Sequence, residues 1–179
     1  PLFNLGTKNN GSDGTLDVYI RGIGPTVGHI FTEAEPFDDE WSHVVFVQED
    51  LERKIYVDGE LDSLEIAPRA EGDWDLNATS IGGIIRDSAS HWVTGVIDEV
   101  GVWNRPITEE EIAYMYNEGN GREIVSTLGI DLAGYWPMDE GSGDVAADTT
   151  GSNNAQLYNE VEWVDDGERG SVLSFNGAD

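Results

Sequence analysis

The stretch that decides the fold is Trp92-Val-Thr-Gly-Val-Ile-Asp-Glu-Val-Gly-Val-Trp-Asn-Arg-Pro106, followed at once by Ile107-Thr-Glu-Glu-Glu-Ile-Ala-Tyr-Met-Tyr116. This pattern predicts a buried strand that carries two carboxylates, then a turn, then a short capped helix. Successive side chains of a strand point to opposite faces of the sheet, so one of Asp98 and Glu99 would face inward. An inward carboxylate needs hydrogen-bond donors or a cation.

The helix is predicted over residues 108–117. Thr108 caps its amino end, and Glu111 stands three residues further on, which is the spacing of a capping box. The first turn is acidic, as the helix dipole prefers. Ile112, Met115 and Tyr116 would give the helix one apolar face against a sheet.

The rest of the chain reads as short strands separated by Gly, Asp and Asn, which predicts an all-β sandwich. Leu16, Val18 and Ile20 alternate on one face of a strand, and Asp58-Gly59 predicts a tight hairpin because both turn positions need a positive φ. Further strands are expected at residues 41–48, 54–57, 80–85, 94–103, 132–138, 155–158, 161–164 and 171–175.

The composition restricts the function. A formal charge of −27, from 36 acidic and 9 basic residues, argues against nucleic acid and anionic membrane as partners. The carboxylates could form a solvating surface for salty surroundings, a set of cation sites, or serve colloidal solubility alone. The absence of cysteine excludes disulfides and thiolate sites. No apolar run approaches the length of a membrane span, and no signal-peptide pattern is present. Because Pro1 is not methionine, the chain is expected to come from a longer protein.

Several motifs resemble those of laminin G-like domains in the concanavalin A-like lectin/glucanase superfamily. In residues 1–125 they follow the order of the later part of such a domain: Trp41-Ser-His-Val44, Ile55-Tyr-Val-Asp-Gly59, Ser80-Ile-Gly-Gly83 and Ile97-Asp-Glu-Val100. The resemblance implies an all-β fold, a two-sheet antiparallel jelly-roll sandwich with one short helix.

Residues 131–179 resemble the opening of such a domain, through Tyr135-Trp-Pro-Met138, Asp148-Thr-Thr-Gly151 and Val172-Leu-Ser-Phe-Asn-Gly177. Two arrangements are open. The segment is either the start of the next repeat in a tandem array or a permuted completion of the same sandwich. We expect its strands to need partners, and the unpaired edges of the first part are the nearest available.

The resemblance also implies a calcium site that joins an opening-loop Asp to the closing strand. It places Asp98 and Asp148 as ligands, with Glu99, the carbonyl of Gly151 and Asn153 as weaker additions. Calcium takes six to eight oxygen ligands, which suits these residues. The structural alternative is that Asp148 caps a turn through its own backbone and that Asp98 is hydrogen-bonded in the core.

Trp74 is the candidate for contact with a ligand, because Glu71-Gly-Asp-Trp-Asp75 is an acidic loop without an obvious apolar partner. Catalysis is not expected. The paired carboxylates of glucanases would stand on one strand as Glu-x-Asp-x-Glu or Glu-x-Asp-x-x-Glu. The first spacing does not occur, and the second occurs once, at Glu60-Leu-Asp-Ser-Leu-Glu65.

We therefore predict a non-catalytic recognition or adhesion module outside the cell, within a larger secreted or surface protein. Its partner would be a glycan or an extracellular protein, bound with the support of calcium, and it would adjoin neighbouring domains of the same polypeptide. Nucleic-acid binding and membrane insertion are not expected. The alternatives are a structural spacer without a ligand and, less favoured, a glycan hydrolase; fold analogy carries much of this interpretation.

Overall fold

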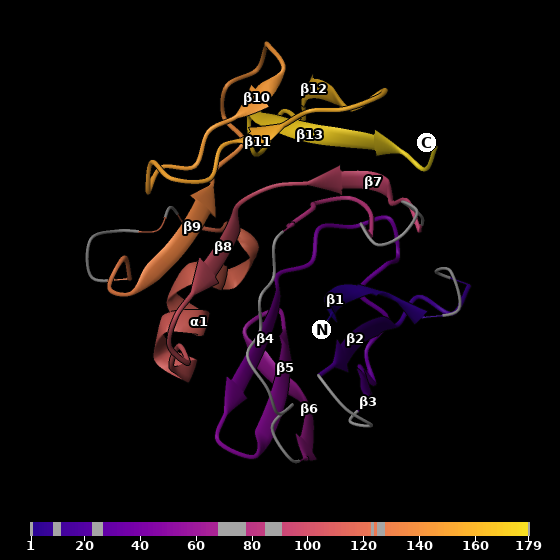
Figure 1. Ribbon diagram of the computed structural model, residues 1–179, viewed down its shortest axis with the longest axis vertical. Coiled ribbons are helices and arrows are strands. Elements are labelled where there is room, and N and C mark those ends of the chain that lie inside the picture. Colours follow the sequence, from indigo (N-terminus) through magenta and orange to yellow (C-terminus); the bar gives the residue numbers. More distant parts are fainter. Residues whose placement is uncertain are drawn as a thin grey trace. The chain divides into compact units, whose positions relative to one another are not determined.

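The computed structural model describes residues 2–8, 12–22, 27–67, 78–84, 91–122, 124 and 128–178. The chain forms two compact units, each built from two separate segments. Unit 1 contains residues 1–77 and 106–124, and unit 2 contains residues 78–105 and 125–179. Figure 1 labels the elements of both units.

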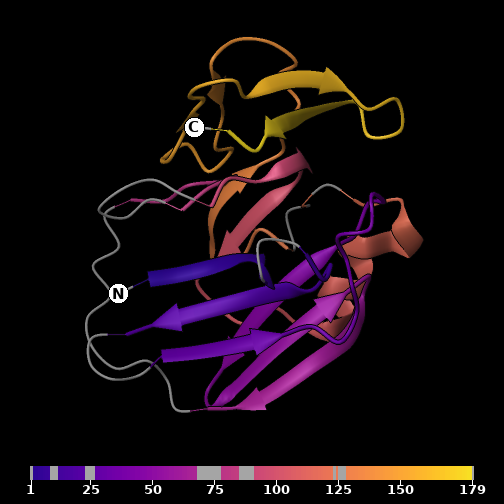
Figure 2. The same cartoon turned by 90° about the vertical axis from the view of Figure 1, so that its right-hand side faces the viewer.

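Unit 1 contains two antiparallel three-stranded sheets (Figure 2). The first sheet has the order β1 (Leu2–Thr7), β2 (Leu16–Arg21) and β3 (Val27–Phe31), and the second has the order β4 (Val44–Glu49), β5 (Glu52–Val57) and β6 (Glu60–Ile66). The alternation predicted for residues 15–20 is confirmed, because Leu16, Val18 and Ile20 are buried on one face of β2. Ile30 and Ile55 complete this core.

The predicted hairpin at Asp58-Gly59 is confirmed. Val57 pairs with Glu60, and both turn residues have positive φ, 50° at Asp58 and 80° at Gly59. The Asp58 carboxylate also accepts a hydrogen bond from the backbone N–H of His43 at 2.8 Å. A β-carbon at Gly59 would lie 2.8 Å from the Tyr116 ring, so packing as well as backbone conformation favours glycine there.

The predicted helix is α1 (Glu109–Tyr116), followed by a 3-10 turn, η2 (Asn117–Gly119). Thr108 forms the expected capping box: its side chain accepts from the Glu111 backbone, and the Glu111 carboxylate accepts from the Thr108 N–H at 2.8 Å. Ile112 and Met115 are buried, which confirms the apolar face of the helix. The Tyr56 hydroxyl on β5 donates to Glu109 at 3.2 Å and ties α1 to the second sheet.

Unit 2 is also antiparallel. Its strands are β7 (Thr94–Ile97), β8 (Val100–Trp103), β9 (Leu132–Trp136), β10 (Val145–Ala146), β11 (Ala155–Gln156), β12 (Glu162–Asp165) and β13 (Ser171–Asn176). They form a three-stranded sheet in the order β12-β13-β7 and two pairs, β8-β9 and β10-β11. Figure 1 shows the yellow strand β13 beside β7, although some 75 residues separate them in the sequence.

The core of unit 2 combines both of its chain segments. Its buried residues are Trp136, Met138, Ala146, Leu173 and Phe175, and the partly buried residues against them include Ile81, Val93, Ile97 and Val100. Residues 131–179 therefore pair with the strands that follow residue 93. Whether the two stretches come from one module or from two stays a prediction.

The all-β antiparallel fold with one short α-helix in the described residues is confirmed, and two local predictions are wrong. The single strand expected over residues 94–103 is split into β7 and β8 at Asp98 and Glu99. The strand expected over residues 80–85 is reduced, within its described part, to an isolated bridge at Ile84. Gly82 explains this second difference, since its φ of 83° is incompatible with an extended strand.

Candidate functional site

The most distinctive polar region of unit 2 is the turn between β7 and β8. Glu99 adopts a φ of 54°, a left-handed backbone conformation that few residues other than glycine occupy. The chain therefore leaves the sheet of β7 and β13 and enters the pair of β8 and β9. The prediction that Asp98 and Glu99 point to opposite faces of one continuous strand is wrong for this reason.

Asp98 is half-buried, and its Oδ1 atom is fully buried without a hydrogen-bond partner among the described residues. Burial raises the pKa of the Asp98 carboxyl to about 7, and the charges of Glu99 and Asp139 add to this effect, while Arg169 opposes it. Binding of either a proton or a cation would therefore stabilise the half-buried Asp98 carboxyl group.

Glu99 is exposed and accepts a short hydrogen bond from the Tyr135 hydroxyl of β9. Tyr135 is itself 6% exposed, so a rigid strand residue positions the Glu99 carboxylate. The sequence did not indicate this contact, because Tyr135 lies 36 residues away in the chain.

Asp148 occupies a different environment, in the loop after β10. Its side chain is 3% exposed, and protein donors surround both of its oxygens. Oδ1 accepts from the backbone N–H groups of Tyr135 and Thr150, both at 2.9 Å. Oδ2 accepts from the Thr150 hydroxyl at 2.6 Å and from the N–H and side-chain amide of Asn153 at 3.0 and 3.2 Å.

This hydrogen bonding determines the charge of Asp148. Burial disfavours the ionised carboxylate, but the bonds from Thr150, Tyr135 and Asn153 outweigh it and hold the pKa of Asp148 far below its usual range. Asp148 is a permanently charged centre that organises the loop. The turn-capping alternative from the sequence describes what the structure shows at this residue.

The other predicted ligands, Asn153 and Gly151, also belong to this loop. The carbonyl of Asn153 accepts from the Trp136 indole N–H at 2.9 Å, and its amide donates to Asp148. Gly151 has a φ of 86° and donates its N–H to the Asp148 carbonyl at 2.8 Å. Asn153 and Gly151 shape the turn around Asp148.

The predicted calcium site fits these residues only in part. A calcium ligand must offer oxygen lone pairs, and those of Asp148 already receive donors. Asp98 and Glu99 fit better, since one has an unpartnered buried oxygen and the other is exposed. Among the described residues, no group of three or more His, Asp or Glu side chains is arranged to hold a metal ion. Asp98 and Asp148 do lie in the same unit.

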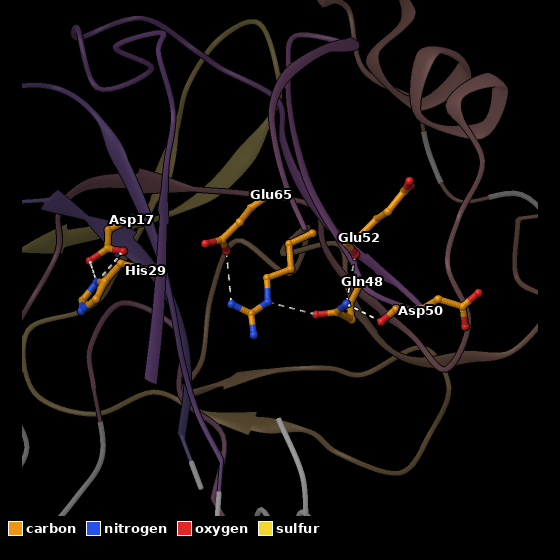
Figure 3. A network of polar contacts seen from close by, with 7 residues as sticks. Asp17, His29, Gln48, Asp50, Glu52 and Glu65 are labelled. Atoms are coloured by element: carbon orange, nitrogen blue, oxygen red, sulfur yellow. Dashed lines mark hydrogen bonds and ion pairs between the residues drawn. The ribbon is translucent and has the colours of Figure 1, made fainter. Parts of the chain in front are cut away.

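Unit 1 contains a buried charge that sequence reasoning missed. Arg53 on β5 is 2% exposed, and its guanidinium donates to Glu65 of β6 and to Gln48 of β4, each at 3.3 Å (Figure 3). A β-carbon at Gly28 would lie 2.3 Å from the Arg53 Nη1, so a larger residue there would displace the guanidinium from its present position. Arg53 is in phase with the core residue Ile55, and this pattern could have revealed it.

On the outer face of the first sheet, His29 pairs with the Asp17 carboxylate at 2.9 Å, as Figure 3 also shows. The His29 ring stacks on Phe31, with ring centroids 5.7 Å apart. Trp74, the predicted ligand contact, lies outside the described residues.

The comparisons with known proteins bear on the family. The laminin G profile of the concanavalin A-like lectin/glucanases superfamily matches residues 3–113. The chain belongs to this laminin G family. The match contains the strands β7 and β8 and ends within helix α1, so the resemblance described for residues 1–125 is confirmed over the matched part. Laminin G-like domains are typically extracellular binding modules and are generally non-catalytic.

The human adhesion G-protein coupled receptor D1 is 28% identical to this laminin G-like chain over 124 residues. That alignment covers 67% of this chain and 14% of the receptor, so the chain spans about one seventh of that relative's length. No helix among the described residues is long and apolar enough to cross a membrane.

Among solved structures, an S-layer domain-containing protein (residues 221–444) from Clostridium thermocellum shares 18% identity with the chain. The superposition covers 59% of this chain and 52% of that one, with a TM-score of 0.39.

Proposed function

We propose that this laminin G-like chain is a non-catalytic recognition or adhesion module that works outside the cell, within a larger secreted or surface protein. Its partner would be a glycan or an extracellular protein. The family membership over residues 3–113 carries this proposal, and the adhesion receptor among its relatives supports it. The charge of −27 supports a partner other than nucleic acid.

The proposed calcium site has fewer protein ligands than the sequence motifs suggested. Asp98 and Glu99 would hold the ion at the β7–β8 turn, whereas Asp148 braces the opening loop through protein donors alone. A divalent cation would neutralise the repulsion between these neighbouring carboxylates and stabilise the turn. The observation that supports this assignment is the buried Oδ1 of Asp98, for which the residues that the structure describes offer no hydrogen-bond partner.

The absence of catalysis is also part of the proposal. An acid with a pKa near 7 beside an ionised carboxylate is a pattern found in glycosidases. Glu99, however, is exposed and held by Tyr135. On β6, where Glu60-Leu-Asp62-Ser-Leu-Glu65 has the glucanase spacing, Asp62 accepts from the backbone N–H groups of Glu33 and Ala34, both at 2.8 Å, and Glu65 pairs with the buried Arg53. These structural partners support the proposal that the carboxylates are not catalytic.

Binding of the full chain to an oligosaccharide array and to an array of extracellular proteins, with millimolar calcium and with chelator, tests the function. We expect saturable binding to a restricted set of ligands, weakened by chelator and by Asp98→Asn. Trp74→Ala reports on the predicted contact loop. Binding to neither array would leave the spacer as the remaining function, and release of reducing sugar from β-glucan would show a hydrolase.

A further inference from the structure

Unit 2 has a hollow of about 270 Å³ at the turn end of the β12–β13 hairpin. Its volume is slightly below the range of sites for small molecules, which is about 300–1,000 Å³, so it suits a single side chain of a partner. Half of the lining is exposed, which leaves an entrance from solvent. The residues that line the hollow are Gly141, Trp163, Val164, Asp165, Gly170 and Ser171.

Strand register brings an indole, a carboxylate and a hydroxyl to one face of this hairpin. Trp163 and Asp165 are two residues apart on β12, so their side chains point to the same face. Asp165 pairs with Ser171 across the hairpin, and Trp163 pairs with Leu173. Leu173 is 4% exposed and packs in the core of unit 2. The three groups therefore lie where the core face of the hairpin reaches its end.

The existing contacts of Trp163 and Asp165 determine what these residues can offer an occupant. The Trp163 indole N–H donates to the Gly143 carbonyl at 2.9 Å, so the remaining contribution of Trp163 is its ring surface. Asp165 is exposed, and its Oδ1 accepts from the Gly167 N–H at 2.9 Å. A carboxylate has about four lone-pair positions, so Asp165 can accept further hydrogen bonds.

Ser171 supplies an independent observation. Its Oγ is buried, and no described residue forms a hydrogen bond with it. Such a group is costly and is rare in native proteins. A β-carbon at Gly141 would lie 3.5 Å from this Oγ, so the glycine leaves the space beside the hydroxyl open. An occupant that donates a hydrogen bond into the hollow would satisfy the Ser171 oxygen.

These properties select a planar cation with several donors. A guanidinium group stacks on aromatic rings, carries five N–H donors and has no acceptor. Its charge is opposite to that of Asp165 and to the net charge of −27. The lining contains no basic residue of the chain itself. Arg169 belongs to the same turn but lies outside the lining, and its charge acts on Asp98.

We propose that this hollow binds an arginine side chain of an extracellular protein. The inference rests on the protein arm of the proposed function, and it names the side chain that the partner presents and the place that receives it. The guanidinium lies on the Trp163 ring and donates to Asp165 and Ser171. Asp98 and Glu99 do not line the hollow, so this contact does not depend on calcium at the β7–β8 turn.

A titration of the full chain with the peptide acetyl-Gly-Arg-Gly-amide, followed by NMR of the Trp163 indole N–H, tests the proposal. The spectrum of Trp163→Phe identifies this signal. We expect a saturable shift with the arginine peptide. The matching citrulline peptide has nearly the same shape without the charge, and it should bind about tenfold more weakly because hydrogen bonds between charged groups are the stronger ones.

Three variants locate the site. Asp165→Asn should lower the affinity for the arginine peptide about tenfold. Glu168→Gln is the matched control, since it removes one exposed carboxylate from the same turn but outside the lining, and its affinity should stay within about twofold of the parent. Ser171→Ala should lower the affinity about threefold, whereas a hydroxyl with a purely structural role would leave it unchanged.

The remaining outcomes separate this inference from the proposed function. Equal affinities of the parent, Asp165→Asn and Glu168→Gln would show a general attraction to an acidic chain and overturn the hollow. Tighter binding of the matching lysine peptide would overturn the assignment to arginine. A chain that binds an extracellular protein but not the arginine peptide would overturn this inference while keeping the recognition function. Peptide binding at Trp163 by a chain that binds no extracellular protein would support the hollow and overturn the protein arm.

Discussion

Asp98 and Asp148 lie in the same unit, yet their environments are opposite. The loop around Asp148 turns backbone and side-chain donors toward both carboxylate oxygens. At the turn, one buried oxygen of Asp98 has no hydrogen-bond partner in the described part of the chain, and a second carboxylate stands beside it. Burial of a carboxylate therefore indicates a cation site only after its donors have been counted.

The same difference separates Asp148, whose charge is constant, from Asp98, whose charge depends on pH. Asp148 is ionised throughout the range in which proteins usually fold, because its donors favour the charged form. Asp98 changes its charge near neutral pH. A change of pH or of calcium concentration should thus act on the β7–β8 turn and leave the loop around Asp148 unaffected.

The largest expected effect is that of Asp148→Ala. This change removes the acceptor of the Tyr135 N–H, which belongs to a buried strand residue, and of the Thr150 and Asn153 N–H groups, which lie in an exposed loop. We expect a loss of about 3 kcal/mol in the free energy of unfolding. Urea unfolding at pH 7 measures this loss. Asp144→Ala, at an exposed neighbouring position, should change stability by less than about 0.5 kcal/mol. Equal losses in the two variants would contradict the structural role of Asp148.

Asp98→Asn should have the opposite sign and depend on pH. The folded-state pKa of about 7 lies above the unfolded value, so the folded chain binds more protons than the unfolded chain between about pH 4 and pH 7. The contribution of Asp98 to stability therefore falls as the pH rises through this window and is lowest above it. We expect Asp98→Asn to be more stable than the parent by about 1–2 kcal/mol at pH 8, with little difference at pH 4.

Urea unfolding at pH 4, 6 and 8 checks this prediction. Asp144→Asn, which removes an exposed carboxylate elsewhere in unit 2, should show no such trend. A stability difference between Asp98→Asn and the parent that is constant with pH would show that Asp98 has an ordinary pKa.

A smaller effect should distinguish two neighbouring threonines. Thr150→Val removes the hydroxyl that donates to Asp148 at 2.6 Å, and we expect a loss of about 1 kcal/mol because the acceptor is charged. Thr149→Val removes a longer bond to the neutral Tyr135 carbonyl at 3.3 Å, so its loss should be under about 0.5 kcal/mol. Thermal melts of the two variants give the ranking, and a reversed ranking would contradict the role of Asp148 as the loop's centre.

Sequence patterns predicted the parts of the fold that depend on local chemistry. The alternation at Leu16, Val18 and Ile20, the Asp58-Gly59 hairpin and the Thr108 cap need only nearby residues, and each of them is confirmed. The strand break at Glu99 was missed, because a left-handed glutamate has no sequence signature comparable to glycine.

The site was harder to predict, since its properties come from distant partners. The Asp148 motif indicated a turn, but its donor from Tyr135 lies 13 residues away. The contact between Glu99 and Tyr135 depends on strand pairing across the chain. These contacts decide which carboxylate has enough hydrogen-bond donors and which one could bind a cation. No local sequence pattern encodes them.

The most direct test of the contrast between the two carboxylates is a titration of the Asp98 and Asp148 side chains by carbon-detected NMR in the full chain, with and without millimolar calcium. We predict that Asp98 titrates near pH 7 and moves to lower pH when calcium is added, whereas Asp148 stays ionised down to the pH at which the chain unfolds. A calcium-dependent shift at Asp148, together with a titration of Asp98 near pH 4 that calcium does not change, would contradict the account.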